Sequence, residues 1–453
     1  MEELIKKQKQ YFATDKTRNL YFRINTLIKL KRAIIDNEKI IAEALKKDLG
    51  KSPTESYITE IGVILEEIKF TLKNIKAWVK PEKVKTPLTQ FKAHSYIYSE
   101  PYGLSLIIGT WNYPFLLCFS PLIGAVVAGN CAIVKPSEVS PNCSEVISKI
   151  IEEVFDEGHV KSIEGGVETA TELLNQKFDY IFYTGSVNVG KIVMQAASKN
   201  LTPLTLELGG KSPCVVDNDI DIDVTARRIV WGKFLNAGQT CIAPDYLYVH
   251  KKVKKELIEK IRESIKEFFS DNPKESPDYP RIVTERHLNR LLNLMNNGKV
   301  VIGGESDKED LYISPTVIDE INWNDPVMQE EIFGPILPVM EYDKLDEVID
   351  IINSHPKPLA LYLFSNNKEK QQRVIDRTSS GGVCINAPIY HQVSSFLPFG
   401  GVGDSGMGGY HGKFSFDTFS HKKAVVIKSF FPDLKMMYPP YKGKLKILRK
   451  IWG

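Results

Sequence analysis

One cysteine lies in a sequence context that suits covalent catalysis. Cys241 ends the segment GQTC, which follows an apolar helical stretch and precedes the strand-like segment DYLYVH. A lone cysteine is more often a small buried hydrophobe than a nucleophile. Gly238, Gln239 and Thr240 predict a loop, however, and catalytic groups tend to lie on loops at the ends of secondary-structure elements. We therefore regard the Cys241 thiol as a candidate nucleophile.

Two other side chains could assist such a nucleophile. Glu207 precedes two glycines in LELGGKS, where a carboxylate can act as a general base for water. Asn112 lies in TWNYP, and its side-chain amide can donate a hydrogen bond to a developing oxyanion. The alternatives are a structural acid at a domain hinge for Glu207 and a turn-forming residue ahead of Pro114 for Asn112.

The segment YTGSVNVGKIV lies between a predicted strand and a predicted helix. Gly185 allows a tight turn, Gly190 lets the helix start pack closely, and N–H groups at a helix start attract phosphate. The segment is not a GxGxxG motif, and a plain strand–helix turn is the alternative. It nearly matches a P-loop, but Ile192 stands where a Mg²⁺-binding Ser or Thr is required, which argues against a nucleotide hydrolase.

A lysine and a glutamate follow another apolar strand. Lys135 and Glu138 are the first and last residues of the segment KPSE, whose lysine ends the predicted strand CAIVK. Ligands of open α/β sheets bind beyond the carboxyl ends of the strands, where such side chains can hydrogen-bond a ribose. An ordinary solvated charge pair is the alternative.

Strands and helices alternate in an order that could bring these segments together. Residues before Trp78 are charged and helical in pattern, and repeated strand–helix units follow from Leu104 onward. This alternation predicts an α/β fold with a doubly wound parallel sheet. We expect a dinucleotide-binding domain in residues 1–206, a second α/β domain carrying the nucleophile in residues 207–392, and an exposed arm and tail in residues 80–99 and 413–453. Within the second domain, a helix is predicted over residues 224–238.

A long uncharged stretch raises the question of a membrane span. No charged residue occurs from Tyr102 to Val134, but several Pro, Gly and Asn residues interrupt the stretch. The better interpretation is a strand over residues 104–109, a helix over 115–129 and a strand over 131–135, in the middle of a parallel sheet. We therefore expect no integral membrane span.

Composition excludes several other classes of protein. The 453 residues carry 59 basic and 56 acidic side chains, a net charge of +3 that gives no support for a nucleic-acid partner. The six cysteines show no spacing typical of metal ligands, so no metal site is expected. A disulfide framework is also not expected, which favours a reducing, cytoplasmic setting. The N-terminal segment lacks the apolar region of a signal peptide.

The segments TWNYP, KPSE, FYTGS, LELGGKS, GQTC, EEIFGP and PFGGVGDSGMG occur here in the order found in aldehyde dehydrogenases. The chain resembles that superfamily over about residues 100–425, and YHGKFSFDTFSHKKA and MMYPPY resemble its class 3 branch. One departure is Thr110, where the superfamily commonly has Pro. This should matter little, because the implied oxyanion donor is Asn112.

The resemblance implies a reaction and roles for these residues. Cys241 would attack an aldehyde, the Asn112 side chain and the Cys241 N–H would hold the oxyanion, and Glu207 would activate water to hydrolyse the resulting thioester. The cofactor would be NAD or NADP. The resemblance also implies that Tyr113 lines the aldehyde tunnel and that Asn386 supports the catalytic loop. Cofactor contacts are implied for Lys135, Glu138, Gly185, Ser186, Gly190, Glu331 and Phe333.

Class 3 resemblance also implies a substrate class and partners. A medium- or long-chain aliphatic or aromatic aldehyde is expected as substrate, and a homodimer is expected through the arm near residues 83–98. The basic, partly apolar tail could cap the substrate tunnel or make a weak peripheral membrane contact.

Three other functions stay open on the sequence. An acylating enzyme would pass the thioester to coenzyme A, although Glu207 disfavours it. A P-loop-like nucleotide hydrolase would rest on the segment from Gly185 to Lys191 alone. A non-catalytic binding protein on the same fold is the third alternative, because fold alone does not guarantee activity.

Overall fold

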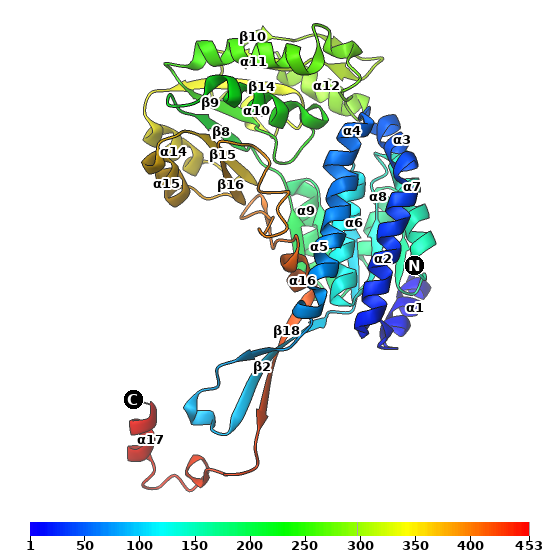
Figure 1. Ribbon diagram of the computed structural model, residues 1–453, viewed down its shortest axis with the longest axis vertical. Helices are drawn as coiled ribbons and strands as arrows, with labels where there is room; N and C mark the ends of the chain where they lie inside the picture. Colours follow the sequence, from blue (N-terminus) through cyan, green and yellow to red (C-terminus); the bar gives the residue numbers. More distant parts are fainter. Residues whose placement is uncertain (297, 453) are drawn as a thin grey trace.

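The computed structural model describes residues 1–296 and 298–452. Two sheets with helices packed on them form the body of the molecule, and a long arm extends from it (Figure 1). The predicted α/β fold with a parallel, doubly wound sheet is confirmed by the strand order and by the parallel pairing in both large sheets.

Helices from the N-terminal part of the chain pack beside the first sheet. Helix α2 contacts α6 and α7, and α5 contacts α6, so these helices form one layer (Figure 1). A π-helical turn, Tyr57–Ile61, joins α4 to α5 and leaves a continuous helical segment. The bounds are α1 Glu2–Phe12, α2 Leu20–Asp36, α3 Glu38–Leu49, α4 Pro53–Ser56 and α5 Gly62–Trp78.

The first sheet has six strands in the order β17-β7-β6-β3-β4-β5. From the central β3 the chain builds β4 and β5 toward one edge and then returns to add β6 and β7 on the other side. The strand order therefore reverses between β3 and β6, which is where open α/β sheets bind ligands. The elements are β3 Leu104–Ile108, α6 Pro114–Ala128, β4 Cys131–Lys135, α7 Pro141–Val154, β5 Val160–Ser162, α8 Val167–Leu174, β6 Tyr180–Thr184, α9 Val187–Ser198, β7 Leu204–Glu207 and β17 Gly406–Met407.

The uncharged stretch is part of this sheet. It forms β3, α6 and β4, as the sequence predicts, and all residues of α6 are buried. Among the described residues, no helix has the length and apolarity needed to cross a membrane.

The second sheet has seven strands in the order β10-β13-β14-β9-β8-β15-β16. It begins only six residues after β7 ends at Glu207, so a short linker connects the two sheets. Its elements are β8 Pro213–Val216, α10 Ile222–Phe234, β9 Tyr246–His250, α11 Lys254–Phe269, α12 Glu285–Leu294, β10 Lys299–Ile302, β13 Thr316–Asp319, α13 Pro326–Gln329, β14 Ile336–Tyr342, α14 Leu345–Ser354, β15 Ala360–Phe364, α15 Lys368–Arg377 and β16 Gly382–Ile385; a separate ribbon pairs β11 Ser306–Asp307 with β12 Tyr312–Ile313.

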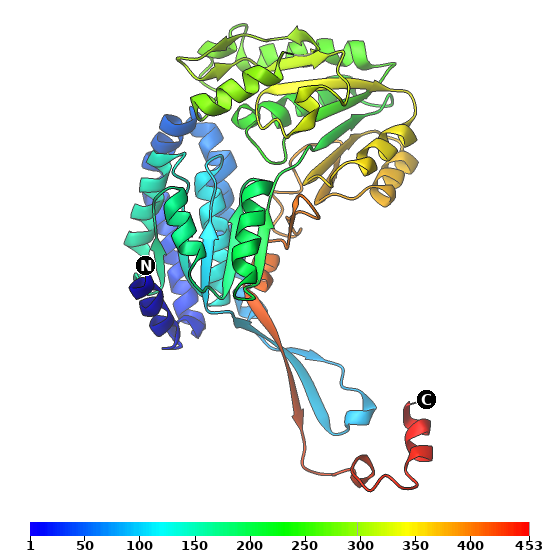
Figure 2. The ribbon, with the colours of Figure 1, turned by 180° about the vertical axis from the view of Figure 1, so that it is seen from behind.

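The arm is a three-stranded antiparallel sheet. Strand β2, Ala93–Pro101, pairs with β1, Glu82–Val84, and over its whole length with β18, Ser420–Lys428. Helix α16, Lys413–Thr418, packs on α6 and connects the arm to the body. The last helix, α17 Leu445–Trp452, lies near the tip of the arm and away from the body (Figure 2).

Candidate active site

The carboxyl edge of the first sheet brings together four segments that the sequence analysis selected. In the order of the sheet, Glu207 ends β7, Gly185 follows β6, the loop carrying Asn112 follows β3, and Lys135 ends β4. Parallel pairing places these ends side by side: Thr184 is opposite Glu207, and Ile108 is opposite Lys135. Residues distant in sequence therefore meet at the point where the strand order reverses.

The loop that carries Cys241 comes from the second sheet. Helix α10 ends at Phe234, so the helix predicted as far as residue 238 is too long by four residues. It ends there because Asn236 and Ala237 adopt left-handed backbone conformations, with φ of 53° and 51°. Asn tolerates this conformation better than most residues, but Ala does not, so the turn is a strained one. Of the six cysteines, Cys241 alone is not fully buried.

One cavity of about 540 Å³ runs along this edge and reaches the cysteine. It contains the three residues predicted to do chemistry, namely Asn112, Glu207 and Cys241. Of the predicted cofactor contacts, Gly185, Ser186, Glu331 and Phe333 also line it. We call this cavity the cofactor cleft.

The other predicted site residues lie outside the cofactor cleft. Lys135 is buried on β4 and pairs with Glu138 at 2.7 Å. Gly190 lies one helical turn into α9, where a Cβ atom would come within 2.7 Å of Leu208. Asn386 exchanges hydrogen bonds with the backbone of Ser365. Tyr113 lines a second cavity.

The first turn of α9 can hold an anionic group. Val187 and Asn188 begin this helix and line the cleft, and the first N–H groups of a helix have no acceptor within it. Ser186 is the N-cap, and its hydroxyl accepts from the Val189 N–H. Gly185 has φ of 159°, and a Cβ atom there would lie 2.2 Å from the Tyr183 hydroxyl. These features fit the pyrophosphate of a dinucleotide.

Buried carboxyl groups give the cleft its acid–base properties. Burial raises the pKa of Glu207 well above its usual range, and within residues 1–296 and 298–452 neither carboxyl oxygen has a hydrogen-bond partner. The pKa of Glu331 is raised to about 8, chiefly by burial and next by the charge of Asp245. The pKa of the Cys241 thiol is raised by burial and then by Glu331 and Glu207. The thiol therefore needs a nearby proton acceptor to become a nucleophile.

A second cavity, of about 120 Å³, meets the cofactor cleft at Cys241. Its walls are mostly apolar, and we call it the apolar tunnel. Tyr113 lines it and forms a 2.6 Å hydrogen bond with Thr240. The tunnel and the cleft share Leu117, Cys241, Phe399 and Tyr410. Further tunnel residues are Ile58, Thr59, Val63, Leu116, Trp231, Leu235, Ile242, Ile389, Gln392 and Val393.

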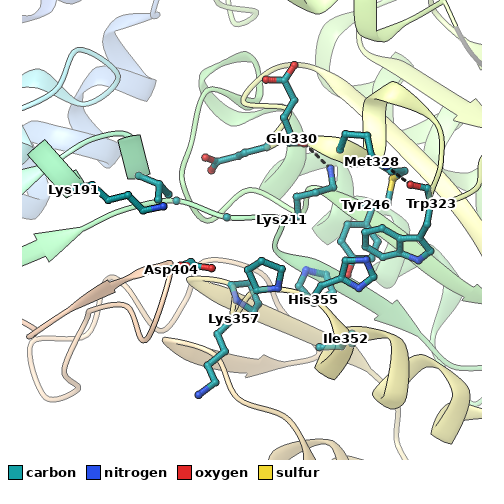
Figure 3. Close-up of a pocket in the computed structure, with 18 residues that line it drawn as sticks. Lys191, Lys211, Tyr246, Trp323, Met328, Glu330, Ile352, His355, Lys357 and Asp404 are labelled. Atoms are coloured by element: carbon teal, nitrogen blue, oxygen red, sulfur yellow. Dashed lines mark hydrogen bonds between the residues drawn. The ribbon is translucent and has the colours of Figure 1, made fainter. Parts of the chain in front are cut away.

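A third cavity shares Glu331 with the cofactor cleft, and Figure 3 shows Lys211 and Glu330 among its lining residues. Lys211 points into it and donates to the Val327 and Glu330 carbonyl oxygens, and it also pairs with Asp245. The second oxygen of Asp245 accepts from the Ile332 N–H at 2.8 Å. The Lys211–Asp245 pair therefore holds the segment that presents Glu331 to the cleft.

Some residues of the cleft gave no signal in the sequence. The Trp111 ring lies 5.1 Å from His287 and 5.4 Å from Phe333, measured between ring centroids. Arg290, one turn from His287 on α12, donates to the carbonyl oxygens of Glu331 and Ile332. His287 and Arg290 are three residues apart in an ordinary amphipathic helix, and only the tertiary fold shows that they face the cleft.

Comparisons with known proteins agree with this geometry. Residues 1–425 match the aldehyde dehydrogenase family. The chain is 51% identical over 99% of its length to 4,4'-diaponeurosporen-aldehyde dehydrogenase of Staphylococcus aureus, of which 98% is covered. It is 48% identical over 98% of its length to a dimeric NADP-preferring aldehyde dehydrogenase of Rattus norvegicus, of which 99% is covered.

A solved structure is also similar. The substrate-bound state of Staphylococcus aureus AldH superimposes with a TM-score of 0.98 at 50% identity, covering 100% of this chain and 99% of that one. The resemblance inferred from the order of the motifs is thus confirmed. The chain belongs to the aldehyde dehydrogenase family, in its class 3 branch, and is an oxidoreductase that converts an aldehyde to a carboxylic acid with NAD or NADP.

Proposed function

We propose that the chain oxidises medium- or long-chain aliphatic or aromatic aldehydes through a thioester on Cys241. The observation that carries this proposal is the position of Cys241 at the junction of the apolar tunnel and the cofactor cleft. The mostly apolar tunnel walls would take the hydrocarbon part of the aldehyde and direct its carbonyl carbon to the thiol.

In the proposed reaction, the Cys241 thiol gives its proton to Glu207 and the sulfur attacks the carbonyl carbon. The new oxyanion accepts hydrogen bonds from the Asn112 amide and the Cys241 N–H. Loss of a hydride leaves a thioester; NAD or NADP, when bound, accepts that hydride. Glu207 passes its first proton to solvent and then takes a proton from water as the water oxygen attacks the thioester. Collapse of this adduct releases the acid, and the Cys241 thiolate takes the second proton back from Glu207 to become the free thiol.

Residues of the cleft and of the neighbouring end of β4 fit the cofactor in three places. We assign Lys135 and Glu138 to the adenosine ribose, because they lie at the carboxyl end of β4. The first turn of α9, after Gly185 and Ser186, suits the pyrophosphate. Glu331 and Phe333 are assigned to the ribose and ring of the nicotinamide, since both line the cleft beside Cys241.

Two substitutions test the covalent step. Cys241→Ala should abolish aldehyde-dependent NADH or NADPH formation, while Cys384→Ala, which removes a buried thiol outside both cavities, should leave it unchanged. Full turnover by Cys241→Ala would refute the proposal. Adding coenzyme A and measuring acyl-CoA distinguishes the acylating alternative, in which the thioester is passed to the coenzyme A thiol.

We further propose a homodimer that forms through the arm, in the cytoplasm. The arm extends from the body (Figure 2). Leu88, Phe91, Val426 and Ile427 of the arm are exposed. The Rattus norvegicus relative is named as dimeric, and all six cysteines are free thiols, which suits a reducing compartment. Sedimentation of the chain and of a Val426→Asp, Ile427→Asp variant tests the dimer, and a monomeric parent chain would refute it.

The tail suits a weak contact with an anionic membrane surface. Helix α17 exposes Leu445, Ile447, Ile451 and Trp452, and three basic residues lie on its opposite side. One short basic helix binds lipid weakly. Trp452 fluorescence should shift on adding anionic vesicles and not on adding neutral ones; the absence of any shift would refute this contact.

A further inference from the structure

A fully buried ion pair lies behind the segment that carries the oxyanion donor. Lys51 and Glu60 are both 0% exposed, and the Lys51 Nζ lies 2.7 Å from Glu60 Oε1. Glu60 belongs to the π-helical turn between α4 and α5, and Lys51 lies just before α4. Turns of this kind occur often at functional sites.

The lysine of this pair holds the backbone of Asn112. Its Nζ donates to the Asn112 carbonyl oxygen at 3.0 Å, and the same oxygen accepts from the Asn236 side-chain amide at 2.9 Å. The ammonium also lies 4.1 Å from the centroid of the Tyr113 ring, within the range of a cation–π contact. One cation thus contacts the oxyanion donor and the neighbouring tunnel residue.

The glutamate of the pair holds the next residues of the chain. Its second oxygen accepts from the N–H groups of Phe115 and Leu116 in the first turn of α6, at 2.9 and 3.3 Å. A carboxylate at this place satisfies N–H groups that have no acceptor within the helix, and it interacts favourably with the helix dipole. The pair therefore contacts residues both before and after Pro114.

The Asn112 side chain is held from the opposite side. Its Nδ2 donates to the Gln239 carbonyl oxygen at 3.0 Å, and that oxygen also accepts from Asn236. Gln239 lies two residues before Cys241. The pair thus acts on the backbone of Asn112, while the loop carrying the nucleophile orients its amide, and the second amide hydrogen of Asn112 stays available for an oxyanion.

We infer that Lys51 and Glu60 are positioning residues that hold the Asn112 amide and the Tyr113 ring against Cys241. The inference rests on the proposed role of Asn112 as oxyanion donor. Replacing a buried ion pair with apolar residues of similar volume is often neutral or stabilising, so stability alone gives no reason to prefer this pair to an apolar one. The need to place catalytic groups to within about 1 Å does explain the presence of the pair, because a misplacement of that size can lower the rate by about 100-fold.

A double-mutant cycle tests the inference. Lys51→Met is made in the parent chain and in Asn112→Ala, and the rate of the first NADH burst is measured per titratable Cys241 thiol. Asn112→Ala should lower this rate by about 100-fold or more. Lys51→Met should lower it by about tenfold in the parent chain and by less than about twofold in Asn112→Ala, because no side-chain donor then remains to be positioned.

Arg23→Met is the matched control. Arg23 is a buried cation at the other end of α6, where it donates to the Val127 carbonyl oxygen at 3.1 Å. It should lower the melting temperature and leave the burst rate per thiol unchanged. If Lys51→Met does not fold, Lys51→Met with Glu60→Gln removes both charges together and is expected to give the same loss.

The outcomes separate the inference from the proposed function. An equal loss in both backgrounds, or no loss in the parent chain, overturns the positioning role and leaves the pair a structural one. An unchanged burst in Asn112→Ala instead refutes the oxyanion assignment on which the inference rests.

Discussion

Replacing Glu207 with glutamine separates the two halves of the proposed reaction. The change keeps the size of the side chain and removes its ability to take a proton. Both carboxyl oxygens are buried and have no partner among the described residues, so the substitution breaks no hydrogen bond there. A loss of activity would then report the missing base and not a disturbed fold.

The size of the effect follows from the single thiol and the single base. Each subunit has one Cys241, so Glu207→Gln should release about one equivalent of NADH per subunit and then turn over slowly, as the thioester accumulates. Loss of a general base costs about 10²–10⁴ in rate. Because Glu207 also accepts the thiol proton in the proposed mechanism, the burst should form more slowly than in the parent chain but should still reach about one equivalent per subunit.

The pH dependence sharpens the prediction. Burial raises the pKa of Glu207, so its carboxyl group stays protonated, and therefore inactive as a base, to a higher pH than that of an exposed glutamate. Hydrolysis of the thioester by the parent chain should therefore increase by about tenfold per pH unit until that pKa is reached. In Glu207→Gln the hydrolysis rate should be low and independent of pH.

Stopped-flow absorbance of NADH over a pH series measures both phases. Glu67→Gln is the control, since Glu67 is a buried acid with a raised pKa that lines neither the cleft nor the tunnel. It should keep the parent rates. Unchanged steady turnover in Glu207→Gln, or parent hydrolysis that does not rise with pH, would refute the assignment of Glu207 as the base.

Three further predictions concern the tunnel, the cofactor and stability. Ile58→Asp places a charge at a half-exposed position of the tunnel. It should raise KM for a long-chain aldehyde by about tenfold, a loss of binding free energy equal to that of burying about two methylene groups, and should leave KM for propanal unchanged. Equal effects on both substrates would contradict a tunnel that binds the hydrocarbon chain. Glu138→Gln removes a negative charge beside Lys135, so KM for NADP should fall relative to KM for NAD, and an unchanged ratio would argue against this ribose site. Burial raises the pKa of Glu67 from 4.5 to about 7, so the free energy of unfolding should be highest below pH 4.5 and should fall by about 3 kcal/mol as the pH rises to 7. Urea unfolding of Glu67→Gln should not show this fall, and parallel pH profiles of the variant and the parent chain would refute the prediction.

The sequence predicts best those parts of the fold that local pattern determines. The pattern from Leu104 to Lys135 predicts a strand, a helix and a strand, and the structure has β3, α6 and β4 there. The glycines, prolines and asparagines that interrupt it are short-range signals. The residues proposed to do chemistry are predicted from the order of the motifs, because each motif by itself has a common structural explanation.

Long-range contacts were not accessible in the same way. The nine-residue ladder between β2 and β18 joins segments more than 300 residues apart, and the arm and tail were expected only as one loosely defined element. Helix α10 stops at Phe234 because of left-handed residues whose conformation is imposed by contacts from elsewhere, such as the hydrogen bond from Asn236 N–H to Glu55. Nothing in the segment FLNAG specifies where that carboxylate lies.

The buried charges show most clearly where the sequence pattern fails. Lys51, Glu60 and Lys233 are completely buried, yet in the sequence they look like any other charged residues of amphipathic helices. A core of the same volume built from apolar side chains would be at least as stable, so stability does not explain them. They cluster around the segments that carry Asn112, Cys241 and Glu331. These buried ionisable groups thus lie where proton transfer and charge development are proposed. Their place in the fold, more than their residue type, marks them as candidates for a functional role.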